Sequence, residues 1–384
     1  MRSLQQCFGS VVVLCVLLVE WIEGASSSVA VSAGSVQQPP PRFLPAKNAE
    51  CSYCACRDDI LDCSVSSLDI FKTVLGLGLH NYTAAIFTLN HIESIDAEFP
   101  EARWETLLLN DNKIAHIKVG AFVNLPLLET LDLSHNLLTV DRLLPHVFKG
   151  RYAVNEYQPM RNLRRLYLGN NNLHSLHPDL FEHLPNLEHL SLESNPLKHI
   201  DKATIIALSS LYSLQSLDLS NTRISEIPDH MLHTPRNLST LNLSRNNFTS
   251  IPEGLADSHA LKHLNLGGNP IEVIRSFPPL PKLEVLHISW MPLLTRIEDG
   301  GLNGLPALTE LHCSHNGRLV EIHAGALSAP TVGGEQSEVW PPLKKMRVSC
   351  GNEGAEHAKT LRGELRYALS RLLQSPTGKK TGCS

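Results

Sequence analysis

The sequence has no long apolar stretch that could cross a membrane after cleavage of a leader. Its apolar run Val11–Val19 has nine residues, and no later run approaches eighteen. A transmembrane helix needs about 20 such residues to span the hydrocarbon core. The C-terminus also has no apolar tail of the kind that directs a lipid anchor. We therefore expect no membrane span in the mature chain.

Strong charge and enzyme motifs are also absent. The net charge is −5, whereas a protein that binds a phosphate backbone needs a marked basic excess. The chain contains no Gly-rich phosphate loop, no G-x-S-x-G and no H-E-x-x-H. These absences predict a protein that is not an enzyme, uses no cofactor and binds no nucleic acid.

The N-terminus has the features of a secretory signal. Arg2 supplies a positive charge, Val11–Val19 the apolar segment, and Gly24, Ala25 and Ser26 small residues for cleavage. An uncleaved signal anchor is the alternative. We predict a signal peptide over 1–26, a flexible Ser-, Gln- and Pro-rich leader over 27–50, and a secreted, extracellular protein.

Leucine is abundant in the sequence and recurs at a regular interval. From residue 85 to residue 322 the pattern L-x-x-L-x-L-x-x-N-x-L-x-x-L recurs, with steps of 22–27 residues and one of 35. This period and pattern are those of a leucine-rich repeat. The second leucine of the pattern marks ten copies, at Ala85, Leu107, Leu131, Leu166, Leu190, Leu217, Leu241, Leu264, Leu286 and Leu311.

The repeats predict an α/β solenoid, a leucine-rich-repeat horseshoe over 67–330. In each copy the segment x-L-x-L-x should form a short strand with its leucines in the core and its x residues outside. These strands stack in parallel and line the concave face. Thr222 and Met291 replace the asparagine in two copies, where we expect a weaker ladder. The asparagine of the other copies should turn the chain and bond buried backbone groups, at Asn112, Asn136, Asn171, Asn195, Asn246, Asn269 and Asn316.

Four of the nine cysteines lie together before the first repeat: Cys51, Cys54, Cys56 and Cys63. Their spacing resembles the N-terminal cysteine flank of extracellular leucine-rich-repeat proteins, and the chain is loosely similar to the small secreted members. The resemblance implies a disulfide-tied cap over 51–66, with the pairs Cys51–Cys56 and Cys54–Cys63. From the residues alone four cysteines allow three pairings, and a zinc site is the alternative to disulfides.

The outward residues of the strands form a concave wall that could bind a ligand. Ten strands at ~4.8 Å spacing give a wall roughly 45 Å long, which suits a protein ligand better than a small molecule. Arg165, Tyr167 and Trp290 are the best candidates, because arginine and aromatic residues dominate interface energies. Solvated histidines are favoured over a metal site on this wall. The other candidate ligand-binding residues are His189, Glu193, Asp218, His263, His287 and His312.

The sequons predict glycosylation at Asn81, Asn237, Asn242 and Asn247. Asn242 belongs to the concave wall, so a glycan there would block part of it. About eleven extra residues lie in 141–162, an insertion that either helps to bind a ligand or is a tolerated loop. Residues 331–384 form a degenerate segment in which 355–373 is expected to be a helix. That helix is either a lid on the solenoid or a basic surface for an acidic partner.

Together these features predict an extracellular scaffold that recognises a protein ligand or receptor through its concave face. The resemblance implies adhesion, regulation of signalling or receptor-type recognition. A structural matrix protein that binds fibrils is the alternative. The sequence specifies neither the ligand nor the oligomeric state.

Overall fold

The computed structural model describes residues 53–65, 75, 82–150, 158–323, 325–326, 343 and 345–350. The chain divides into two units, Met1–Ala46 and Lys47–Ser384, and every described residue belongs to the second. The predicted signal peptide, the leader, Cys51, Asn81 and the helix over 355–373 lie outside the described residues. Their boundaries and roles stay predictions.

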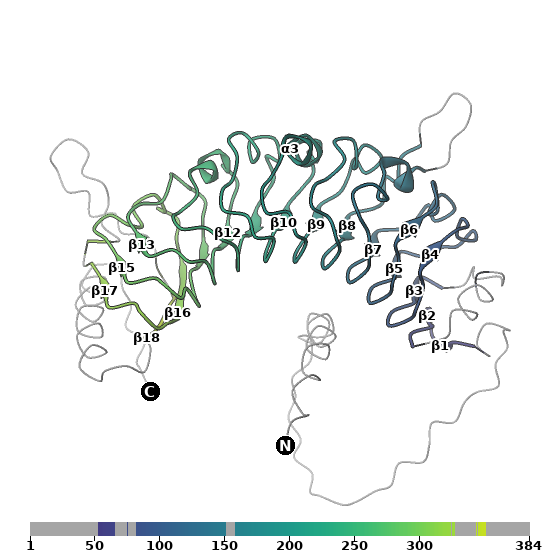
Figure 1. Cartoon of the computed structure of the whole chain (residues 1–384), viewed down its shortest axis with the longest axis horizontal. Helices are drawn as coiled ribbons and strands as arrows, with labels where there is room; N and C mark the ends of the chain where they lie inside the picture. Colours follow the sequence, from purple (N-terminus) through teal and green to yellow (C-terminus); the bar gives the residue numbers. More distant parts are fainter. Residues whose placement is uncertain are drawn as a thin grey trace, which may run out of the picture. The chain divides into compact units, whose positions relative to one another are not determined.

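The main sheet confirms the predicted stack of short parallel strands (Figure 1). Within the described ranges it has thirteen strands, of which only β1 and β2 pair antiparallel. In order they are β1 (Ala55–Arg57), β2 (Ile60–Asp62), β3 (Ala84–Ile86), β5 (Thr106–Leu108), β7 (Thr130–Asp132), β8 (Arg165–Tyr167), β9 (His189–Ser191), β10 (Ser216–Asp218), β11 (Thr240–Asn242), β12 (His263–Asn265), β14 (Val285–His287), β16 (Glu310–Asn316) and β18 (Lys345–Cys350).

Each repeat strand buries its central residue and leaves its two flanking residues partly exposed. Leu131 and Leu166, for example, are fully buried, and they lie side by side in the register of β7 and β8. The alternation follows from the pleat, which turns successive side chains to opposite faces. Because all ten marked positions are buried in this way, the leucine pattern located the core correctly.

The remaining elements lie along the coils. Helix α3 (Lys202–Ser209) and the 3-10 helices η2 (Pro145–Phe148) and η3 (Glu253–Asp257) run on the outer side, opposite the main sheet (Figure 1). No helix within the described ranges is long and apolar enough to cross a membrane. Strands and turns thus make up most of the solenoid. Two small sheets complete it: β4 (Ser94–Ile95) with β6 (His116–Ile117), and β13 (Val273–Ile274) with β15 (Arg296–Ile297) and β17 (Glu321–Ile322).

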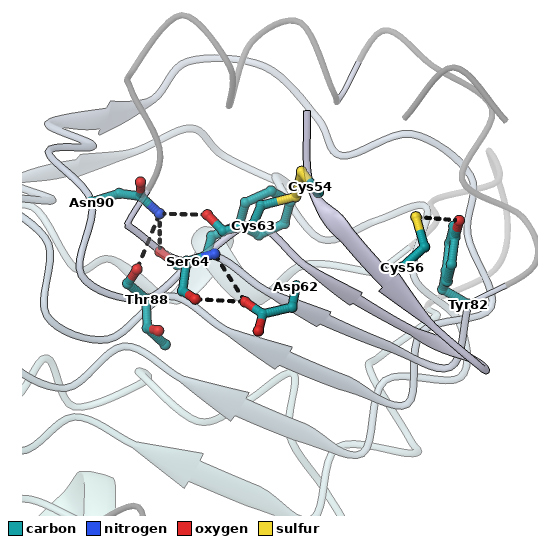
Figure 2. The surroundings of a disulfide bond; sticks show 9 residues. Cys54, Cys56, Asp62, Cys63, Ser64, Tyr82, Thr88 and Asn90 are labelled. Carbon is teal, nitrogen blue, oxygen red and sulfur yellow. Dashed lines mark hydrogen bonds between the residues drawn. A yellow bond between two sulfur atoms is a disulfide. The ribbon is translucent and has the colours of Figure 1, made fainter. Parts of the chain in front are cut away.

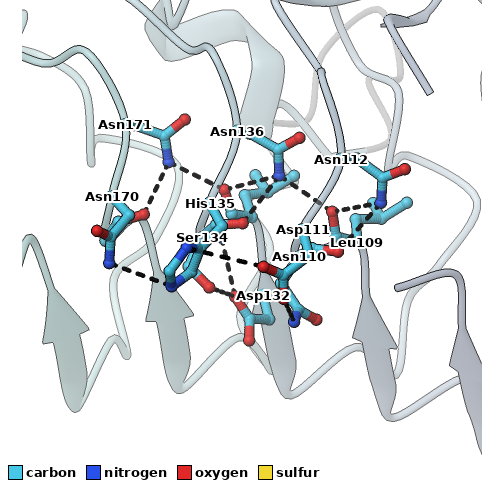
Figure 3. Close-up of polar contacts among 12 residues, drawn as sticks. Leu109, Asn110, Asp111, Asn112, Asp132, Ser134, His135, Asn136, Asn170 and Asn171 are labelled. Carbon is cyan, nitrogen blue, oxygen red and sulfur yellow. Dashed lines mark hydrogen bonds and ion pairs between the residues drawn. The ribbon is translucent and has the colours of Figure 1, made fainter. Parts of the chain in front are cut away.

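Buried asparagines join most of the described coils to the one before, as Figure 3 shows for three of them. Asn136 donates from Nδ2 to the carbonyls of Leu133 and Leu109, and its Oδ1 accepts the N–H of Ile114. These bonds satisfy backbone groups that the turn would otherwise bury without partners. Asn90, which the pattern did not single out, begins the ladder by donating to the carbonyls of Cys63 and Phe87.

The ladder is interrupted where Thr222 replaces asparagine. Its hydroxyl donates 2.8 Å to the carbonyl of Leu219 within the same coil, but it is too short to reach the previous one. There the N–H of Leu197 bonds the carbonyl of Asn195 instead. A side-chain link between two coils is thus missing next to the repeat that contains α3, although the N–H of Lys198 still bonds the carbonyl of Thr222. That the ladder is weaker there stays a prediction.

A cysteine-rich cap adds β1 and β2 to the N-terminal end of the sheet (Figure 2). Cys54 and Cys63 form a disulfide, which is one of the two pairs implied by the resemblance. Cys56 is also disulfide-bonded, and its Sγ accepts a hydrogen bond from the Tyr82 hydroxyl. Leu61 in β2 is fully buried, so the cap supplies apolar cover for the first coil.

Aromatic rings fill the outer half of the first coils. Phe99 stacks on Phe122 with 5.7 Å between ring centroids, and Phe122 stacks on Phe148 at 6.4 Å. Trp104 packs edge-on against Phe99 and is fully buried. Phe148 belongs to the 141–162 insertion and is fully buried, so the aromatic stack extends the core into the start of that segment.

Candidate functional site

The nine predicted ligand-binding residues lie on the concave wall or on the turns that follow its strands. Arg165 and His189 are neighbours in the register of β8 and β9, and Tyr167 ends β8. His263 begins β12 and Asp218 ends β10. None of these five lines the groove described next, so the structure does not bring the whole set together.

A groove of about 870 Å³, which we call the concave groove, runs from Glu193 to His315 across the C-terminal half of the wall. Four predicted residues line it: Glu193, His287, Trp290 and His312. The groove crosses β11, β12, β14 and β16, so its floor consists of rigid sheet. Such a floor is pre-organised, which lowers the entropic cost of binding.

Two glycines hollow out the middle of the concave groove. A Cβ at Gly267 would lie 2.7 Å from the carbonyl oxygen of Ser289, so the neighbouring coil leaves no room for one. Gly268 has φ +75°, and a Cβ there would approach the Cγ of Arg245 to 3.1 Å. Since neither glycine carries a side chain, the wall is depressed between Arg245 and Trp290.

A row of residues with left-handed backbone edges the concave wall. Each member directly precedes the asparagine position of its coil, with φ between 51° and 75°. This conformation costs about 1–2 kcal/mol for residues other than glycine, asparagine and aspartate. Sequence reasoning missed this left-handed row, although its place before the asparagine could have revealed it. Its members are Leu89, Asp111, His135, Asn170, Ser194, Asn221, Arg245, Gly268, Trp290 and His315.

Trp290 lines the concave groove and is 64% exposed. Its indole stacks on the His315 ring with 4.0 Å between centroids and 1° between planes. The next position of the left-handed row on its other side is Gly268, so no side chain of the row covers the indole there. The ring is held in place on one side and open on the other.

His287 and His312 form a second stacked pair, as their shared register predicts. Their ring centroids are 4.2 Å apart and their planes differ by 10°. Nε2 of His312 lies 3.2 Å from Oε2 of Glu310, which also accepts a 2.8 Å bond from Nζ of Lys345. Burial and the neighbouring His312 lower the pKa of His287. The neutral form of His287 is therefore favoured near pH 7.

Acidic residues occupy the N-terminal end of the concave groove and the wall beyond it. Burial, with Asp218 next in effect, raises the pKa of Glu193. Burial also raises the pKa of Asp132, against the hydrogen bonds that its carboxylate accepts from Ser134 (Figure 3). Carboxylates that are partly desolvated in this way favour a partner that brings hydrogen-bond donors or positive charge.

We expect the protein to lose stability as the pH falls from about 7 to about 5. Burial lowers the pKa of His183, His189 and His287 in the folded state. Below about pH 6.5 the unfolded chain therefore binds more protons than the folded chain, so stability decreases until the pH drops beneath the folded pKa values. Thermal melting across this range measures the slope. His287→Gln should make it shallower, because it removes one of these three groups.

Three of the four predicted glycosylation sites lie among the described residues. Asn237 and Asn247 are exposed. Asn242 ends β11 inside the concave groove, where its Nδ2 donates 2.9 Å to Asp218. A glycan on Asn242 would replace that bond and fill part of the groove.

Part of the repeat region matches a known family model. The leucine rich repeat model matches residues 103–150, 161–215 and 212–271. Transforming growth factor beta activator LRRC33 of Danio rerio is 33% identical over 170 residues, which cover 44% of this chain and 24% of that protein. Lumican of Homo sapiens is 34% identical over 185 residues, which cover 43% of this chain and 51% of lumican. The chain thus spans between a quarter and half of these relatives.

A solved structure is similar in fold. The Leptospira interrogans LRR protein LIC12759 superimposes with a TM-score of 0.52 at 21% identity, over 80% of this chain and 88% of that one. At this level of identity the likeness concerns the stack of coils alone.

Proposed function

We propose that the chain, whose residues 103–150 and 161–271 match the leucine rich repeat model, is an extracellular scaffold that binds a protein ligand in its concave groove. The observation that carries the proposal is Trp290, an exposed indole fixed against His315 at the edge of a hollow formed by Gly267 and Gly268. A rigid aromatic anchor beside a depression is the usual centre of a protein interface. Polar groups around it would then fix the orientation of the partner.

Secretion is part of the proposal. It is supported by the apolar run Val11–Val19 behind Arg2 and by the disulfide between Cys54 and Cys63. Disulfides persist in oxidising compartments and are rare in the cytosol. The relative whose name describes activation of transforming growth factor beta suggests secreted growth factors as one class of ligand.

A glycan inserted into the concave groove tests the proposal. His287→Asn creates the sequon Asn-Ile-Ser over 287–289, and Lys202→Asn creates Asn-Ala-Thr on the outer helix α3 as a matched control. Both variants and the parent chain are screened against an array of secreted and cell-surface ectodomains that includes transforming growth factor beta. Glycopeptide mass spectrometry establishes the occupancy of each added site and of Asn242.

We expect at least one ligand of the parent chain to be lost with the His287→Asn glycan and kept with the Lys202→Asn glycan. Equal binding by both variants would contradict the groove as the site. Full occupancy of Asn242 in the binding-competent protein would contradict it as well. Co-sedimentation with collagen fibrils measures the alternative, since lateral association along a fibril should barely respond to either glycan.

A further inference from the structure

The insertion over 141–162 places a histidine next to the following coil, on the side of the solenoid away from the concave groove. His146 lies in η2, whereas Glu182 and His183 lie in the turn after Phe181. One ligand atom from each of the three side chains can be chosen so that all lie within 4.8 Å of one another. Among the described residues this is the one group of three that satisfies that criterion.

His183 is the fixed member of this cluster. Its side chain is 8% exposed, and its Nε2 lies 3.0 Å from Oε1 of Glu182. Its backbone carbonyl accepts a 2.9 Å bond from the N–H of Met160, which attaches the turn to the end of the insertion. The imidazole is thus held at the bottom of the cluster by the packing of two coils.

His146 and Glu182 are the adjustable members. Their side chains are 65% and 44% exposed, and Nδ1 of His146 lies 3.9 Å from Oε1 of Glu182. In a tetrahedral site with metal–ligand bonds near 2.0–2.1 Å, neighbouring ligand atoms lie about 3.3 Å apart. A modest rotation of two solvent-facing side chains therefore gives coordination distances, with no movement of the backbone.

We propose that His146, Glu182 and His183 bind a zinc ion. Two imidazoles and one carboxylate are a ligand set that zinc accepts in proteins, with water in the fourth position. A bound ion would fasten η2, and with it the insertion, to the next coil. His146 of η2 would then link the start of the insertion to the turn that contains Glu182 and His183.

Two charges beside His183 act on a cation with opposite sign. The carboxylate of Glu182 contributes the negative charge that a divalent cation needs, against the repulsion of Lys149.

Zinc titration of the purified full chain tests the proposal. The chain is stripped with a chelator and titrated with zinc chloride by calorimetry, and the visible spectrum with cobalt reports the coordination geometry. His146→Ala and Glu182→Gln remove exposed ligands without disturbing the core. His323→Ala is the matched control, since Nδ1 of His323 lies 3.4 Å from Oδ1 of Asp299 in a pair outside the three-residue cluster.

We expect one saturable site in the parent chain with a tetrahedral cobalt spectrum. Each ligand substitution should weaken it by roughly tenfold or more, and the control should leave it unchanged. Zinc should also raise the melting temperature of the parent and of His323→Ala, but not of His146→Ala. Absence of a saturable site, or equal affinity in the parent and both ligand variants, would overturn the proposal.

Discussion

Replacing Asn195 by alanine should lower the free energy of unfolding by about 2–4 kcal/mol. Asn195 is 1% exposed; its Nδ2 donates to the carbonyls of Leu168 and Leu192, and its Oδ1 accepts the N–H of Leu173. Alanine leaves the buried N–H of Leu173 unsatisfied, which costs about 1–3 kcal/mol, and removes one bond from each carbonyl. The two carbonyls still accept from Nδ2 of Asn171 and from the backbone N–H of residue 195. The effect should be large here because the next rung, at Thr222, is already incomplete.

Urea unfolding followed by circular dichroism measures this loss. Asn186→Ala is the control, because Asn186 is exposed and donates one bond, to the carbonyl of Arg161. The control should cost no more than about 1 kcal/mol. A similar loss in both variants would show that the ladder has no special role. If the curve of Asn195→Ala splits into two transitions, the coils on either side unfold separately, as stacked repeats can when one interface weakens.

The sequence predicts the periodic parts of this fold well because their physical cause is local. Leu131 and Leu166 are buried since a strand alternates its faces, and Asn136 turns inward since the turn buries backbone groups. His287 and His312 are neighbours because they occupy paired positions of β14 and β16, whereas the stacking of their rings is a finding of the structure. In each case the spacing along the chain determines the position in space.

The sequence predicts the candidate sites less well because they depend on what is missing or on distant contacts. The concave groove is hollow in the middle because Gly267 and Gly268 have no side chains between Arg245 and Trp290. A sequence motif marks side chains that are present, so it does not reveal such a hollow. The cluster of His146 with Glu182 and His183 joins segments on either side of an insertion. No periodicity relates those positions, so only the folded chain brings them together.

Replacing Trp290 by alanine should weaken binding of a groove-dependent ligand by about 30- to 1,000-fold. Removal of a central aromatic anchor typically costs about 2–4 kcal/mol of binding free energy. Trp290 meets the conditions for such an anchor, because it is 64% exposed in the free protein and its orientation is already fixed by His315. Surface plasmon resonance with the ligand identified by the glycan test measures the change. Tyr212→Ala is the matched control. Tyr212 is 70% exposed, lies shortly after α3 and does not line the concave groove.

A second substitution at the same position separates binding from stability. Trp290 has φ +61°, a conformation that asparagine adopts more easily, and asparagine occupies the equivalent place of the left-handed row at Asn170 and Asn221. Trp290→Asn should therefore bind as poorly as Trp290→Ala while unfolding at the same or a higher urea concentration than the parent. Undiminished binding by both variants would contradict Trp290 as the anchor. The site would then be sought elsewhere on the wall, at Arg165 and Tyr167. The left-handed backbone also occurs at Leu89, His135 and Arg245, so it belongs to the repeat, and the comparison of the two variants isolates the effect of the indole.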